Sequence, residues 1–256
     1  MKLICPVCAE PLRKENKEAV CENNHHFDYA KSGYLNLLVS NKKVHGDDAA
    51  MVKARTAFLE SGGYAFLRNR LSELTEGSHV LADLGCGEGY YTGAFKAEER
   101  YGFDLFRDAL KHAAKKDREG FYTVASIFHL PLPDESCDTA VTCFAPHARE
   151  EIFRILKPSG IFIFVTPGER HLFEMKEVLY EHPYENTPEE LDTQLELIHS
   201  EKLSEVMDLS NEQIRNLFMM TPYVWRTGEA DRKRLYETPE LNVTAEFIIR
   251  VYRKNA

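Results

Sequence analysis

The sequence predicts an α/β protein with a mostly parallel sheet and a small N-terminal domain. From residue 80 onward, short apolar runs alternate with helical segments, which is typical of a parallel sheet covered by helices. Residues 161–166 are almost continuously apolar, which indicates a strand buried on both faces. The first forty residues instead carry a cysteine pattern and little apolar sequence. A chain of 256 residues suits one large domain and one small one.

The small domain is predicted to bind a metal. Cys5 and Cys8 form a Cys-x-x-Cys pair, and Cys21 and His25 follow a charged, hairpin-like stretch over residues 9–20. Three thiolates and one imidazole can close a tetrahedral zinc site, which leaves no position open for catalysis. Zinc would supply the folding free energy that so small a core cannot. His25 is the favoured fourth ligand, and the adjacent His26 is the competing one. The alternative to a zinc site is a set of unrelated cysteines. A thioredoxin-like redox role is not expected, because no βαβ unit follows the Cys-x-x-Cys pair.

The next segment is predicted to connect two domains. Residues 41–48 are polar and contain Gly46, as in a linker, and residues 49–59 and 64–74 have helical periodicity around a Ser-Gly-Gly break. Tyr64 follows this break and either folds over a cofactor or packs in the core. The expected division is a metal-binding domain over residues 1–40, a linker with helices over 41–75, and a catalytic domain over 76–256.

A glycine-rich turn after the first strand marks the predicted cofactor site. Residues 80–83 read as a strand that ends in Asp83, Gly85, Gly87 and Gly89 follow at alternate positions, and Asp104 ends the next strand. Such glycines let a ligand approach main-chain N–H groups, and a carboxylate at Asp104 is placed to bind ribose hydroxyls. The alternative is a tight turn and nothing more. The spacing differs from the Gly-x-Gly-x-x-Gly dinucleotide fingerprint.

The Asp-x-Gly-x-Gly-x-Gly pattern resembles motif I of the class I S-adenosylmethionine-dependent methyltransferases. This resemblance implies a Rossmann-like sheet of seven strands with S-adenosylmethionine as cofactor. The remaining elements agree with it, since the final segments suit an antiparallel strand pair and residues 167–172 leave the carboxyl edge, where such sheets bind ligands. The expected strands are 101–104, 121–125, 137–144, 161–166, 195–199 and 245–252; the expected helices are 90–95, 109–116, 150–156, 172–180 and 211–219; and 157–160 is a turn.

Composition restricts the partners and the compartment. The net charge of −9 argues against nonspecific polyanion binding, and no DNA partner is expected. Residues 1–46, however, hold seven Lys and Arg against five Asp and Glu, so a phosphate backbone would be contacted there. No apolar stretch reaches the length of a membrane span, and a cytoplasmic protein without membrane contact is expected. Cys86, Cys137 and Cys143 fall in predicted core segments as thiols.

Motifs along nearly the whole chain resemble the bacterial 23S rRNA guanine-N(1)-methyltransferases. They are the Cys and His pattern with Phe27-Asp28, Ala54-Arg55-Thr56-Ala57-Phe58-Leu59, the glycine turn through Thr92, Val124-Ala125-Ser126, Phe144-Ala145-Pro146, Thr166 to Leu172, and Met220 to Arg226. That family methylates a hairpin-loop guanine in domain II of 23S rRNA.

This resemblance implies the roles of individual residues. Zinc would be held by Cys5, Cys8, Cys21 and His25, and the finger would help to grip rRNA. Tyr64, Gly87, Glu88 and His171 match positions that contact S-adenosylmethionine, and Asp83, Gly85, Gly89, Asp104 and Ser126 complete the expected cofactor site. A homodimer with its fingers beside an RNA cleft is also implied.

The chemistry requires a proton acceptor, because N1 of guanine bears a proton at neutral pH. The candidates are His147, Glu169 and Glu174, and His147 is favoured because it follows Phe144-Ala145-Pro146. Phe144 or Trp225 is expected to stack on the base or to pack in the core. Two other functions stay open: a methyltransferase for small molecules, and a zinc-dependent RNA-binding protein without catalysis.

Overall fold

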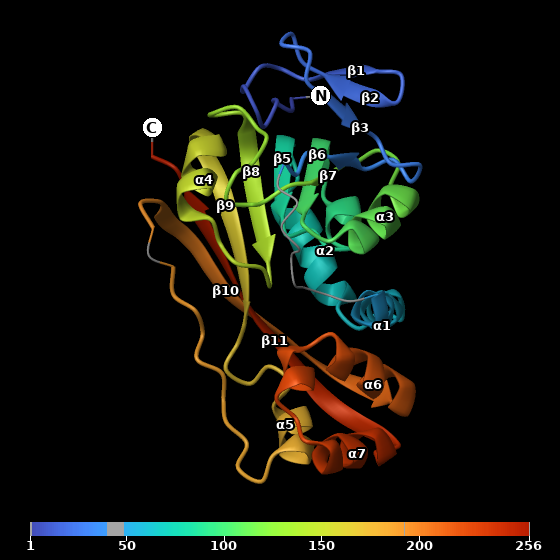
Figure 1. The fold of residues 1–256 in the computed structure, drawn as a ribbon. Helices are drawn as coiled ribbons and strands as arrows, with labels where there is room; N and C mark the ends of the chain where they lie inside the picture. Colours follow the sequence, from blue (N-terminus) through green and yellow to red (C-terminus); the bar gives the residue numbers. More distant parts are fainter. Residues whose placement is uncertain (1, 40–48, 192, 256) are drawn as a thin grey trace.

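A central sheet of eight strands organises the protein. The structure is a computed structural model that describes residues 2–39, 49–191 and 193–255 (Figure 1). The strand order is β10-β11-β9-β8-β5-β6-β7-β4, and neighbours from β9 to β4 run parallel, whereas β11 and β10 are antiparallel. The strands are β4 (Leu35–Asn36), β5 (Ser78–Leu84), β6 (Ala97–Asp104), β7 (Phe121–Val124), β8 (Cys137–Cys143), β9 (Leu156–Pro167), β10 (Glu196–Ser210) and β11 (Glu240–Arg253).

The predicted count of seven strands is corrected to eight by β4. This strand comes from the N-terminal segment and pairs in parallel with β7, Leu35 opposite Thr123 and Asn36 opposite Val124. Two residues carry no readable alternation, so the sequence pattern could not reveal the strand. The N-terminal domain therefore supplies the edge of the central sheet.

Both faces of the sheet are buried. Along β5, Val80 and Ala82 belong to one core cluster and Leu81 to another, as alternation requires. The first face packs on α4 (Arg149–Ile155) and on N-terminal residues, and the second on α2 (Ala65–Leu74) and α3 (Arg107–Lys116). The predicted core thiols follow this pattern, with Cys86 and Cys137 buried and Cys143 half-buried.

A C-terminal lobe extends from the sheet. The far ends of β10 and β11 form a long antiparallel pair beyond the parallel strands, and helices gather around it (Figure 1). Its helices are α5 (Phe173–Leu179), α6 (Asn211–Met219), η2 (Pro222–Trp225) and α7 (Glu229–Glu237), and α1 (Ala49–Glu60) packs against α6. Phe58 of α1 and Phe218 of α6 share one core cluster, so the lobe is joined to the sheet by apolar packing.

The first part of the N-terminal domain, residues 2–29, is called the ribbon below and is attached directly to the body of the protein. Its antiparallel sheet contains β1 (Arg13–Glu15), β2 (Glu18–Val20) and β3 (His26–Asp28), which confirms the predicted hairpin. The Ile4 N–H donates to the Pro131 carbonyl at 3.0 Å, and the Lys2 N–H to the Tyr101 hydroxyl at 2.8 Å. Leu3 and Leu12 join the core cluster of the sheet. The ribbon is therefore held by a shared core.

Two local predictions were wrong for identifiable reasons. The expected helix over 90–95 is only the 3-10 turn η1 (Thr92–Ala94), because the Thr92 hydroxyl is anchored on Asp83 and β6 begins at Ala97. The expected turn over 157–160 is the irregular start of β9, where Ser159 has a positive φ of 64°. The predicted linker 41–48 lies outside the described residues. None of the helices that the structure describes is both long and apolar enough to cross a bilayer.

Candidate functional site

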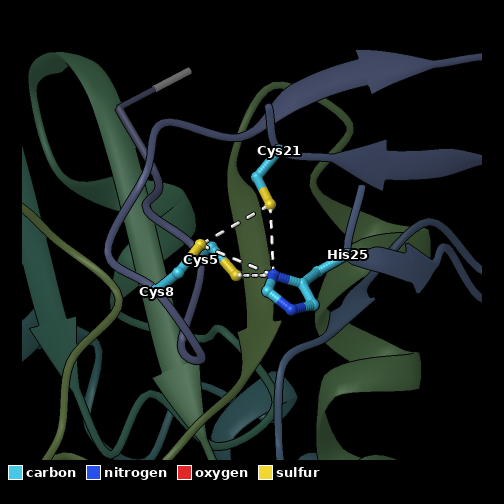
Figure 2. Close-up of side chains that lie close together, drawn as sticks. All are labelled: Cys5, Cys8, Cys21 and His25. Carbon is cyan, nitrogen blue, oxygen red and sulfur yellow. Dashed lines mark hydrogen bonds between the residues drawn. The ribbon is translucent and has the colours of Figure 1, made fainter. Parts of the chain in front are cut away.

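Cys5, Cys8, Cys21 and His25 converge in the ribbon. Figure 2 shows the three sulfur atoms around the ring of His25, whose Nδ1 lies 3.5, 3.5 and 3.4 Å from the Sγ atoms of Cys5, Cys8 and Cys21. The Sγ atoms of Cys8 and Cys21 are 3.7 Å apart. Two tight turns present these ligands, with Ala9 and Asn24 in the left-handed region. All four ligand atoms lie within 4.8 Å of one another.

This donor set fits zinc. A tetrahedral ion with Zn–S near 2.3 Å and Zn–N near 2.0 Å places sulfur atoms about 3.8 Å apart and sulfur and nitrogen about 3.6 Å apart. The separations in the ribbon are close to these values. Hydrogen bonding to the Asn23 side chain lowers the pKa of the Cys8 thiol to about 6, whereas burial raises the pKa of Cys5. The competing His26 instead pairs with Glu18 at 2.7 Å.

The glycine turn packs against the loop that leaves β8. Gly85 has a φ of 82°, and a Cβ there would lie 2.4 Å from the Cβ of Ala145, so no larger residue fits. Gly87 has a φ of 54°, and its Cβ position meets only the Arg55 guanidinium, at 3.8 Å, which leaves main chain accessible to a ligand. The Gly87 N–H donates to Asp104 at 2.9 Å. Gly89 is buried against Ala113 of α3.

Acidic side chains concentrate at this turn. Asp83 is buried and accepts a hydrogen bond from the Thr92 hydroxyl at 2.5 Å. The pKa of Asp83 is raised to about 7, chiefly by burial and also by the carboxylates of Asp104 and Glu88, against the lowering effect of the Thr92 hydrogen bond. Glu88 accepts from the Arg55 side chain of α1 at 2.8 Å. Sequence patterns could not identify this ion pair, because no local signal joins α1 to the turn.

A hollow of about 310 Å³ opens beside the turn. Glu88 and Tyr90 line it from the turn, Thr56 and Leu59 from α1, and His112 and Lys115 from α3. The Glu88 side chain therefore pairs with Arg55 and also borders the hollow.

An aromatic cluster adjoins the turn. Tyr64 is buried against Phe58 and Phe247, and its hydroxyl lies 3.5 Å from Nε2 of His171. Burial lowers the pKa of His171 to about 3, and its Nδ1 accepts from the Glu246 N–H at 3.2 Å, so the ring is neutral with its proton on Nε2. The structure therefore brings together residues 64, 144 and 171 from three loops. Phe247 and Glu246 were not anticipated.

Phe144 forms the open side of this cluster. Its ring lies 5.2 Å from that of Phe247 and 6.4 Å from that of Tyr64, and 43% of the residue is exposed. Its φ is 58°, a strained conformation for a bulky L-residue, and such strain gathers at functional sites. The next residue, Ala145, contacts Gly85, so the exposed ring of Phe144 lies beside the glycine turn.

The remaining predicted residues lie around this centre. The Nδ1 atom of His147 is 3.2 Å from a Glu189 carboxylate oxygen, and its ring packs edge-on against Phe164, on the other face of the sheet from Tyr64. Ser126 follows β7, and its hydroxyl accepts from the Phe128 N–H at 3.2 Å. Glu174 is occupied by both the N–H and the hydroxyl of Thr244. Glu169 and Trp225 are exposed.

The ribbon geometry predicts one zinc ion per chain. Replacing His25 by Ala removes a ligand, so bound zinc should fall well below one equivalent and the ribbon should lose much of its folding free energy, since metal binding supplies it. The matched control is His26→Ala, which should retain full zinc because His26 pairs with Glu18. Elemental analysis and thermal unfolding with and without chelator measure both effects. Equal zinc loss in the two variants would contradict the assignment.

Because Asp83 is buried, replacing it by a neutral residue should stabilise the protein, and this stabilisation should depend on pH. The folded pKa of about 7 lies above the unfolded value of 3.8, so the folded state binds more protons and the wild type loses stability as pH rises from about 4 to 7. At about 1.4 kcal/mol per unit, the total is at most about 4 kcal/mol. Asp83→Asn has no such titration, so its stability relative to wild type should increase over this range and then level off. Urea unfolding of the cofactor-free protein at pH 5 and pH 8 is the measurement, and a constant difference would refute it.

Comparisons with known proteins agree with both halves of this arrangement. A zinc-ribbon family model described as "RlmA, N-terminal" matches residues 3–45, and a model described as "Methyltransferase domain" matches residues 82–164. Among solved structures, the protein bound to the Haloferax volcanii Trm112 methyltransferase activator superimposes with a TM-score of 0.51. The match covers 82% of this chain and 96% of that one at 20% identity, and it shows the fold alone.

Two curated relatives match nearly the full length. The Streptomyces fradiae 23S rRNA (guanine(748)-N(1))-methyltransferase is 32% identical, over 94% of this chain and 92% of its own. The Bacillus subtilis protein YxjB, provisionally named a 23S rRNA (guanine-N(1)-)-methyltransferase, is 28% identical over 98% of this chain and 96% of its own. The predicted zinc and S-adenosylmethionine cofactors are those of the matched domains. On its sequence, its fold and its metal centre, this chain belongs to the family of 23S rRNA (guanine-N(1))-methyltransferases.

Proposed function

We propose that the protein transfers a methyl group from S-adenosylmethionine to N1 of a guanine in a hairpin loop of domain II of 23S rRNA. The observation that carries this proposal is the zinc ribbon, which shares one core with the methyltransferase sheet. A 23S rRNA (guanine-N(1))-methyltransferase matches the chain over both parts. An enzyme for small molecules has no evident use for such a ribbon. A binding protein without catalysis would not need the open main chain at Gly87.

The cofactor is expected along the carboxyl edge of β5, β6 and β7. S-adenosylmethionine, when bound, supplies a sulfonium methyl group whose C–S bond breaks as the new N–C bond forms. The Gly87 main chain is open to a ligand, and Asp104 holds the turn through the Gly87 N–H. We expect Glu88 and Asp104 to bind ribose or ammonium groups, Ser126 to bind the adenine end, and Tyr64 and His171 to contact the far side of the cofactor. Asp83, Gly85 and Gly89 shape the turn itself.

The target guanine is expected on Phe144. Its ring is exposed on one side and supported by Phe247 on the other, so it offers a platform on which a base can stack. A loop guanine is easily unstacked from RNA, which suits a site at a sheet edge. Ala145 packs on Gly85, so a base stacked on Phe144 would lie next to the cofactor turn. Pro146 narrows the conformations of this loop.

The proton on N1 is proposed to pass to His147, which follows Phe144 by three residues in the loop that leaves β8, at the edge where the two faces of the sheet meet. Glu189 lies 3.2 Å from Nδ1, which favours the tautomer with its proton on Nδ1 and leaves the Nε2 lone pair to accept. The N1 lone pair forms the bond to carbon while the N1 proton leaves to Nε2, so charge on the base is relieved as the methyl arrives. Glu174 suits this role less, because Thr244 already occupies its carboxylate.

The assembly and the compartment follow the family resemblance. We propose a homodimer whose two ribbons border one RNA cleft, acting in the cytoplasm where ribosomal RNA is made available. These expectations do not enter the chemistry of a single site.

The proposed function predicts methylation of one guanine in 23S rRNA. Incubation with labelled S-adenosylmethionine and unmodified 23S rRNA should label one guanine, which mass spectrometry of nuclease fragments locates. Gly85→Ala should abolish labelling, because its Cβ would lie 2.4 Å from that of Ala145. The exposed Gly228→Ala, at a negative φ, is the control and should stay active. Donor binding by calorimetry without rRNA labelling would favour a small-molecule enzyme, and no donor binding would favour a protein without catalysis.

A further prediction concerns the proton acceptor. His147→Ala should lower kcat by about a hundredfold or more with little change in the KM for RNA, as expected for loss of general base catalysis. Glu189→Gln should give a smaller loss, because it only orients the ring. The pH profile of kcat between 6 and 9 provides the measurement. Turnover unchanged across this range in His147→Ala would remove His147 from the mechanism.

A further inference from the structure

A basic groove of about 510 Å³ lies between α3 and residues 30–34, the connector that leads from β3 of the ribbon to β4. Its walls are residues 30–32 and Tyr34 on one side and Arg107, Asp108, Lys111 and Lys115 of α3 on the other. Lys31, Arg107, Lys111 and Lys115 are exposed, and Asp108 is the one carboxylate residue among the lining side chains. Such a concentration of positive charge is unusual in a chain whose net charge is −9.

The cations of α3 are arranged in one line. Arg107, Lys111 and Lys115 are four residues apart, so they share a face of the helix, while Ala109, Leu110 and Ala113 face the core. Like charges at this spacing destabilise a helix, and a cation at its first position opposes the helix dipole. The neighbouring Lys116 pairs with Glu60 at 2.7 Å, whereas within the described ranges no ion pair involves the three cations or Lys31. Stability of the fold therefore does not explain them.

The groove connects the ribbon to the cofactor edge. Arg107 follows Asp104 by three residues, and the Phe106 N–H is tied to the Asp104 carboxylate at 2.8 Å, so the start of α3 lies at the carboxyl edge of β6. At the other end, Arg118 donates to the Ser32 carbonyl at 3.3 Å. The stripe from Arg107 to Lys115 spans about 12 Å of helix. Figure 1 shows α3 (green) just below the connector (blue), which its C-terminal end meets near Ala114.

The ribbon side of the groove carries further positive charge. Tyr29 precedes the connector, and the Lys14 ammonium lies 5.0 Å from the centre of its ring. Because the connector is fixed by β4, the cations of the ribbon and of α3 keep a constant separation. A fixed line of exposed, unneutralised cations suits a regularly spaced polyanion better than a single small anion.

We propose that this groove is a phosphate track, in which the backbone of the substrate RNA runs along α3 from the ribbon connector to the cofactor edge. The proposal rests on the function proposed above and adds the path of the RNA to it. Lys31 would contact phosphates distant from the target base, and Arg107 would contact phosphates close to it. These contacts are to the backbone, so they should add affinity without sequence preference.

The test uses the full-length protein, a hairpin transcript containing the target loop, and the triple variant Arg107→Gln, Lys111→Gln, Lys115→Gln. The KM for RNA should rise about tenfold or more with kcat nearly unchanged. The slope of log affinity against log salt should fall in magnitude by about 2, at roughly 0.7 per lost phosphate contact. Lys233→Gln, an exposed cation of α7, is the control and should behave as wild type. Thermal unfolding should show that the triple variant is at least as stable as wild type, because the removed charges repel one another.

The direction in which the RNA runs along the groove is tested by single substitutions at its two ends. On a hairpin shortened at the stem, Lys31→Gln should cease to weaken binding, whereas Arg107→Gln should still weaken it. Wild-type KM and salt slope in the triple variant would overturn the track, as would equal effects of both single substitutions on both RNAs. If the wild type binds S-adenosylmethionine but methylates no rRNA, the proposed function fails instead, a result that does not depend on these variants.

Discussion

The parallel pairing of β4 with β7 is the constraint on which the arrangement of the two domains depends. Leu35 is buried and Asn36 pairs with Val124, so the chain leaving the ribbon becomes the last strand of the catalytic sheet. The zinc cluster organises a unit that cannot fold on apolar burial alone, and β4 then determines where that unit stands. A ribbon on a free linker could search for RNA but could not orient it. Here the ribbon and the sheet share one core, so whatever the ribbon binds has a defined position relative to the catalytic edge.

A second constraint acts at that edge, where two loops pack too closely for ordinary side chains. The contact between Gly85 and Ala145 requires a glycine, and the strained φ of Phe144 is maintained next to it. The Tyr64 and His171 rings then fill the space behind, and His171 stays neutral because it is buried. The outcome is a closely packed, rigid wall on which the ring of Phe144 is exposed. Rigidity matters for methyl transfer, because a reaction without covalent assistance from the protein depends chiefly on how the two reactants are positioned.

The sequence predicted the features that depend on residues close together in the chain. The spacing of Cys5, Cys8, Cys21 and His25 and the alternation of glycines each lie within a short segment, so the zinc ligands were grouped and the turn was recognised. Features that depend on tertiary contacts were missed. The strand β4 is two residues long, Arg55 meets Glu88 across 33 positions, and the expected helix at 90–95 was replaced once Thr92 bonded to Asp83. The cationic face of α3 reads as an ordinary solvated surface until the connector is placed opposite it.

The distribution of charge in the fold follows from these placements. Asp83, Glu88 and Asp104 gather at the glycine turn, where a sulfonium and an ammonium carry positive charge, and the raised pKa of Asp83 reflects their mutual repulsion as well as burial. The cations lie on the outer side of α3 and on the connector, and Lys115 also borders the hollow beside the turn. An RNA backbone is repelled by the first region and attracted by the second, so only an uncharged part of a nucleotide, its base, approaches the turn at low electrostatic cost. A protein with a net negative charge can thus bind a polyanion without admitting its phosphates to the place where the cationic donor must sit.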